Sequence, residues 1–145
     1  MKPQEVERAT RGDLHVVADV VSPCSYCGVP CSGTFRLWYV DGDERNAFEV
    51  NRLTLEALLA PLVEAASDAE GYARLSTFIR NWNEGVGWAG MEEAAPVAAA
   101  DMLVTIEALK AHHGNHGRLK AALASLEEFV VRGCQQQREF WAGET

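Results

Sequence analysis

TFRLWYVDGDERNAFEV, residues 34–50, is the stretch of sequence that decides the fold. Residues 34–40 carry three aromatic side chains in an apolar run, which is typical of a β-strand. Asp41-Gly42-Asp43-Glu44 is a turn signal, and residues 47–50 supply a returning strand. The stretch therefore predicts an antiparallel β-hairpin.

The residues before the hairpin predict one further strand. Residues 13–21 (DLHVVADVV) alternate and are rich in β-branched side chains, so they fit a strand that is buried on both sides. Residues 22–33 contain two prolines and two glycines, which end this strand. Residues 1–12 are polar and are expected to be frayed or to form a short helix. The N-terminal half is therefore predicted to be a small three-stranded antiparallel sheet.

After the hairpin the hydrophobic period changes to that of a helix. Ser67 and Glu70 fit a capping box at the start of a second helix, and Gly114 suits the end of a third. The four expected helices span about 54–66, 67–83, 91–113 and 118–140. Strands followed by helices predict an α+β fold, in which the small sheet packs against about four helices in one domain of residues 1–145.

The composition and charge of the chain limit which classes of protein it fits. The chain of 145 residues is 48% hydrophobic and 23% charged, which suits a globular domain. Its 21 acidic and 13 basic residues give a net charge of −8, and the basic residues form no run, which argues against nucleic acid or an anionic membrane as the main ligand. No apolar stretch reaches the roughly 18 residues of a membrane span. Residues 1–8 lack the apolar region of a signal peptide, so we expect a cytoplasmic protein.

Three of the four cysteines lie close together in Cys24-Ser25-Tyr26-Cys27-Gly28-Val29-Pro30-Cys31. In a reducing compartment such a cluster more often binds metal or does catalysis than forms a disulfide framework. Cys24-x-x-Cys27-Gly28 is similar to the zinc knuckle of rubredoxins and zinc ribbons, and with the following hairpin and helix it resembles a treble clef. Residues 51–56 supply no further cysteine or histidine, which departs from that pattern. We expect zinc on Cys24, Cys27 and Cys31, and rank an iron–sulfur cluster lower.

The fourth metal ligand would come from a distant part of the chain. Cys134 is the first candidate, although its position on the apolar stripe of the last helix also suits an inert buried thiol. Histidines near a helix end also suit the C-terminal dipole as solvated side chains. The histidine alternatives are His15, His112, His113 and His116.

A thiol-dependent redox protein or enzyme is the main alternative. Cys24-Ser25-Tyr26-Cys27 resembles the active-site tetrapeptide of glutaredoxins, which implies Cys24 or Cys27 as nucleophile and Cys31 as resolving thiol. In that family the first cysteine caps a helix, whereas the glycines and proline of residues 28–33 disfavour a helix there. A third interpretation leaves the cysteines reduced and without a site.

A protein partner is the ligand expected for the remaining surface. Two tryptophans bracket a glycine-rich connection, and tryptophan is favoured in interface hot spots, although a lid on the core is the other interpretation. The expected contact residues are Trp82, Asn83, Glu84 and Trp88. The preferred function is non-enzymatic: an acidic protein with a zinc-pinned loop that acts on a protein partner, as an immunity or adaptor protein does.

Overall fold

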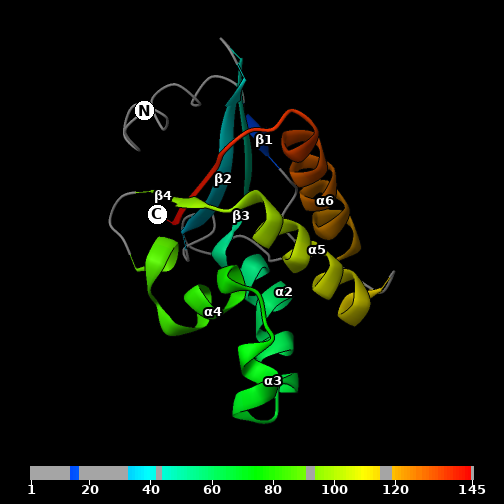
Figure 1. Cartoon of the computed structure of the whole chain (residues 1–145). Helices are drawn as coiled ribbons and strands as arrows, with labels where there is room; N and C mark the ends of the chain where they lie inside the picture. Colours follow the sequence, from blue (N-terminus) through cyan, green and yellow to red (C-terminus); the bar gives the residue numbers. More distant parts are fainter. Residues whose placement is uncertain (1–13, 17–32, 42–43, 91–93, 115–118, 145) are drawn as a thin grey trace, which may run out of the picture.

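The computed structural model describes residues 14–16, 33–41, 44–90, 94–114 and 119–144, and Figure 1 shows their arrangement. Within these ranges, five strands form one sheet in the order β1-β3-β2-β5-β4. Neighbouring strands are antiparallel except β1 and β3, which are parallel. The strands are β1 (Leu14–Val16), β2 (Thr34–Asp41), β3 (Glu44–Asn51), β4 (Ala95–Val97) and β5 (Phe140–Glu144). The helices are α2 (Arg52–Ala65), α3 (Ala69–Ala73), α4 (Thr77–Glu84), α5 (Ala99–His113) and α6 (Lys120–Gln135), with a 3₁₀ turn η1 (Gly87–Ala89).

The predicted hairpin is confirmed by β2 and β3. Their register pairs Thr34 with Asn51 and Leu37 with Phe48. Successive side chains of a strand point to opposite faces of the sheet. On β2, Phe35, Leu37 and Tyr39 therefore share the face toward the helices, where all three are completely buried. The α+β class is also confirmed, but the expected three-stranded, all-antiparallel sheet is wrong in two respects. It has additional strands, and β1 runs parallel to β3.

Strands β4 and β5 replace parts of two predicted helices. The last helix ends at Gln135 instead of Phe140, since Gln137 takes a φ of 56° and the N–H of Arg138 donates to the carbonyl of Gly133. The chain then returns as β5 between β2 and β4. The third helix begins at Ala99, because Pro96 lacks an N–H and favours extended backbone at the residue before it. Pro96 lies on β4, an edge strand of the sheet, where a missing donor is tolerated.

The single helix expected over 67–83 is divided into α3 and α4. Asp68, instead of Ser67, caps α3 by accepting a 2.7 Å hydrogen bond from the N–H of Gly71. Helix α4 has its own cap, since Ser76 Oγ accepts from the N–H of Ile79. The carboxylate of Asp101, which projects from α5, accepts from the N–H groups of the first two residues of α4 at 2.9 and 2.7 Å. In a continuous helix these N–H groups would donate to backbone carbonyls of the preceding turn. At the start of α4 the capping oxygens accept from them instead.

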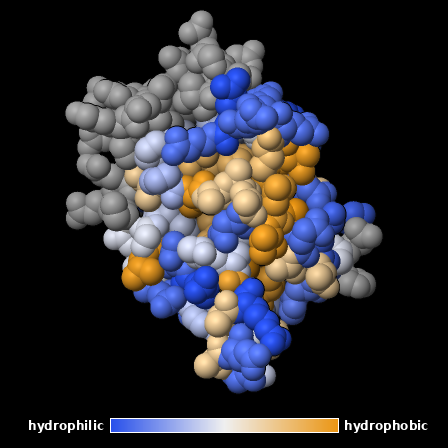
Figure 2. Space-filling view, in the orientation of Figure 1, coloured by the Kyte–Doolittle hydropathy of each residue, from blue (hydrophilic) through white to orange (hydrophobic). Residues whose placement is uncertain are grey.

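The main core lies between one face of the sheet and the helices (Figure 1). Its aromatic part includes Trp88, which is 1% exposed and stacks on Phe78 with ring centroids 4.6 Å apart. Figure 2 shows apolar side chains gathered over α5 and the neighbouring α6, where Leu103, Val104 and Val131 are exposed. None of the helices in the described part of the chain has the length and hydrophobicity needed to cross a membrane.

Candidate functional site

The predicted metal ligands are only partly visible in the structure. Cys24, Cys27, Cys31 and His116 lie outside the described residues. Cys134 is a free, partly buried thiol on α6, with Sγ 3.9 Å from the carbonyl oxygen of Ala99. Burial raises the pKa of the Cys134 thiol, which favours the neutral form over the thiolate that a metal binds.

The histidine candidates lie on two elements. His112 and His113 are in the last turn of α5, with their rings in edge contact at 5.0 Å. His113 Nε2 donates to the carbonyl of Leu58 at 2.8 Å, so this nitrogen is already engaged. The backbone of His15 lies on β1 opposite Phe48. Among the described residues, no three histidine, cysteine or carboxylate side chains converge in a way that could hold a metal ion.

Cys134 and Gly33 lie near opposite ends of β2. Gly33 is the first described residue after the cysteine-containing segment. Gly133, the neighbour of Cys134, is so close to β2 that a Cβ there would lie 3.1 Å from Cδ1 of Tyr39. Gly33, which precedes β2, is at the other end of that strand. From Gly33 to Tyr39 the extended chain covers about 20 Å, at roughly 3.3 Å per residue. The structure therefore does not bring Cys134 near Gly33.

The two ends of the segment 17–32 meet the sheet at the same end. Val16 on β1 pairs with Glu49, and Thr34 on β2 pairs with Asn51, so both lie toward the C-terminal end of β3. Helix α2 starts directly after Asn51. The N–H of Arg52 donates to the carbonyl of Gly33 at 3.1 Å and ties the start of α2 to the residue before β2.

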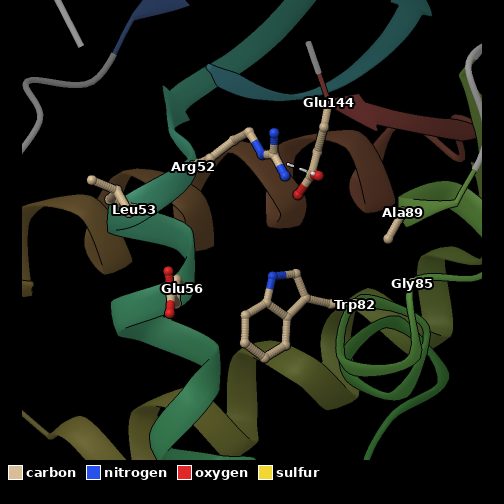
Figure 3. A pocket seen from close by; sticks show the side chains of 7 residues that line it. All are labelled: Arg52, Leu53, Glu56, Trp82, Gly85, Ala89 and Glu144. Atoms are coloured by element: carbon tan, nitrogen blue, oxygen red, sulfur yellow. Dashed lines mark ion pairs between the residues drawn. The ribbon is translucent and has the colours of Figure 1, made fainter. Parts of the chain in front are cut away.

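A pocket of about 370 Å³ opens at this end of the sheet (Figure 3). Its lining comes from the start of α2, the end of α4 with the turn that follows, and the C-terminal end of β5. The lining residues are Arg52, Leu53, Glu56, Trp82, Gly85, Ala89 and Glu144. We call this the Trp82 pocket.

Local sequence explains how these walls are placed. Asn51 Oδ1 accepts a 2.7 Å hydrogen bond from the N–H of Leu53 and so fixes the first turn of α2. Gly85 ends α4 in the left-handed conformation, with φ of 65°, which glycine adopts without strain. Gly90 then approaches Gly85 so closely that a Cβ on residue 90 would overlap the Gly85 carbonyl oxygen. On β5, Glu144 is in register with Phe35 of β2.

The described lining of the Trp82 pocket carries one guanidinium and two carboxylates. Arg52 Nε lies 3.2 Å from Glu144 Oε2, and the side chain of Glu144 is only 15% exposed. Burial raises the pKa of Glu144, and the neighbouring Arg52 opposes that rise without cancelling it. Glu56 is exposed and forms no ion pair with the described residues. The indole nitrogen of Trp82 is on the side of its ring that faces the Arg52–Glu144 pair (Figure 3).

The predicted partner-contact residues divide into two groups. Trp82 is partly exposed and lines the pocket. Asn83 and Glu84 are exposed beside it, where Asn83 Nδ2 donates to the hydroxyl of Tyr72 and that hydroxyl donates to Glu84. Trp88 instead fills the core, and its Nε1 donates to the carbonyl of Phe78 at 3.3 Å. The lid interpretation therefore holds for Trp88, which offers no surface to a partner.

Sequence reasoning missed the charged residues of the pocket. Arg52 and Glu56 belong to an ordinary helix start, and no spacing marks them as a site. Glu144 was not identified as a site residue, because the strand that carries it was not predicted. Comparison of the chain with protein-family models, curated proteins and solved structures found no match.

Proposed function

We propose that this chain is a non-enzymatic binding protein that recognises a protein partner through the surface around the Trp82 pocket. We further propose that Cys24, Cys27 and Cys31 hold a zinc ion that fixes the segment between β1 and β2 beside this surface. The observation that carries the proposal is the hydrogen bond from Arg52 to the carbonyl of Gly33. Arg52 lines the pocket, so the cysteine-containing segment rejoins the described chain at the pocket wall.

Chain reach supports the placement of the metal. Cys31 is two residues from Gly33, and two residues span about 7 Å at most. Zinc–sulfur bonds of about 2.3 Å keep two sulfurs on one ion within roughly 4.6 Å of each other. A zinc ion on Cys31 would therefore be within reach of the start of α2, which is bonded to Gly33, whereas Gly133, the neighbour of Cys134, packs against Tyr39 at the other end of β2. For this reason we leave Cys134 out of the proposed ligand set and favour His15, on the strand that precedes the segment.

The chemistry of the pocket supports a recognition role. A tryptophan beside opposite charges in a small concave site is typical of an interface hot spot. Leu53 and Val86 are 43% and 48% exposed, Leu53 in the pocket lining and Val86 next to the lining residue Gly85. Contacts made by such residues around a hot spot exclude water from it. Asn83 and Glu84 extend the polar surface beyond it.

Metal analysis of the untagged protein tests the zinc proposal. We expect about one zinc per chain after purification under reducing conditions without chelator. Cys27→Ser should lose the metal and lower the melting temperature, because a structural zinc site contributes to folding. Cys134→Ala is the matched control and should keep the metal.

Two results would contradict the proposal. Zinc-free wild-type protein with one thiol much more acidic than about 8.5 would favour the redox alternative. Loss of zinc from Cys134→Ala with the fold retained would return Cys134 to the ligand set.

A further inference from the structure

Polar groups from three elements line the Trp82 pocket. Glu56 projects from α2, Glu144 comes from β5, and the indole of Trp82 comes from the last turn of α4 (Figure 3). Arg52 and Glu144 form one side of the space, and the Trp82 ring lies across from them. A ligand in this space would meet an aromatic ring and two carboxylates from separate elements.

The charge of the pocket favours a cation. In the part of the lining that the structure describes, two carboxylates outnumber a single guanidinium, and the whole chain carries a charge of −8. Glu144 is mostly buried, and its raised pKa indicates that Arg52 compensates its charge incompletely. Arg52 contacts Glu144 Oε2 through Nε. A second cation could bind the remaining carboxylate oxygens and improve that compensation.

An anion fits the pocket less well. Among the described lining residues, Arg52 is the one with a cationic side chain, and it is already paired with Glu144. The first N–H groups of α2 are occupied too, because those of Arg52 and Leu53 donate to Gly33 and Asn51. An incoming carboxylate would also face the like charges of Glu56 and Glu144, which disfavours it.

The shape and the aromatic ring select among cations. A volume of about 370 Å³ is near the lower end for ligand sites and suits one long side chain instead of a large cofactor. A guanidinium stacks on an indole and donates through a planar fork to carboxylates, which an ammonium does less well. Arginine is also enriched in interface hot spots.

We propose that the Trp82 pocket receives an arginine side chain of the partner protein, with its guanidinium against the Trp82 indole and its N–H groups donating to Glu56 and Glu144. This inference rests on the proposed function and names the chemistry of the partner. It makes the pocket the specificity-determining contact of the surface. The metal site plays no direct part in the contact.

The first test titrates the protein with N-acetyl-arginine methylamide while the indole N–H signal of Trp82 is followed by NMR. Such a small probe should bind weakly, with a dissociation constant on the order of 1 mM. The neutral isostere N-acetyl-citrulline methylamide should bind at least about five-fold more weakly, since it lacks the charge. The lysine analogue should lie between the two.

Pocket variants decide whether the probe binds where we propose. Glu56→Gln and Trp82→Leu should each weaken binding of the arginine probe by about five-fold or more. Glu64→Gln is the matched control, because Glu64 is an exposed carboxylate of the same helix outside the pocket lining, and it should leave binding unchanged. Equal binding of the citrulline probe, or equal affinity in Glu56→Gln, would overturn the inference. The inference would also be overturned if the arginine probe, at a concentration about ten times the expected dissociation constant, did not shift the Trp82 signal.

A random-peptide selection separates this inference from the proposed function. Peptides that bind wild type but not Trp82→Leu should share an arginine, and the arginine probe should compete with them. Trp82-dependent peptides without a basic residue would overturn the inference and leave the binding function standing. A selection that yields no Trp82-dependent peptide would count against both.

Discussion

Glu144 is the residue whose protonation should control the Trp82 pocket. Burial raises its pKa above the ordinary value of 4.5, and Arg52 opposes the rise. A bound cation favours the ionised carboxylate, so protonation competes with binding as the pH falls through the raised pKa of the free protein. The arginine probe should therefore bind more weakly at about pH 5 than at about pH 7.5, which repeating the NMR titration at both values measures.

Glu144→Gln is the control for this pH dependence. The amide keeps the shape of the side chain but does not titrate, so the variant should bind more weakly at neutral pH and respond less to acid. A pH profile as steep as that of wild type in Glu144→Gln would show that Glu144 does not face the ligand.

Single residues differ in how far the sequence reveals them. The cysteines at 24, 27 and 31 stand out because metal and thiol chemistry require close spacing along the chain. Trp82 stands out as an aromatic side chain beside a glycine-rich turn. Arg52 and Glu144 do not, because their pairing at 3.2 Å is created by the sheet that brings the two ends together. A site built from distant, common side chains leaves no local pattern.

The start of α4 depends on a side chain from another helix. Asp101 of α5 accepts from the N–H groups of Thr77 and Phe78, in addition to the local cap by Ser76. Asp101→Ala should lower the free energy of unfolding by about 1 kcal/mol, a typical value for loss of a cap. Denaturant unfolding measures this change, and hydrogen exchange at the Phe78 amide should accelerate.

Glu107→Ala is the matched control for Asp101. It removes a carboxylate from the same helix, but that carboxylate is exposed and lies 3.9 Å from Lys110. Exposed pairs of this kind contribute about 0–1 kcal/mol, and this one is at the outer limit of distance. Equal stability changes in the two variants would mean that the interhelix cap contributes nothing specific.

Elements formed by local rules were predictable, and elements that depend on distant pairing were not. The hairpin β2–β3 and helix α2 follow from residue periodicity and a short turn. Strand β5 is short, follows a helix directly and exists because β2 and β4 pair with it on both sides. The division between α3 and α4 likewise involves Asp101, which no local pattern connects to the amides of Thr77 and Phe78.

At the scale of the whole molecule, segregation of strands and helices correctly predicted the α+β class. It could not predict the end of the sheet at which the Trp82 pocket opens. Strand order answers this, because β1 and β2 place both ends of the segment 17–32 beside the C-terminal end of β3, where the Trp82 pocket opens. The proposed zinc ion on Cys24, Cys27 and Cys31 is therefore expected at that end, away from Cys134.

Cobalt substitution for zinc, followed by NMR, measures this placement most directly. A paramagnetic ion bound by Cys24, Cys27 and Cys31 should shift or broaden the amide signal of Arg52 and the indole signal of Trp82, and leave the amide of Gly133 nearly unchanged. Strong effects at Gly133 with none at Arg52 would place the metal at the other end of the sheet and contradict the account.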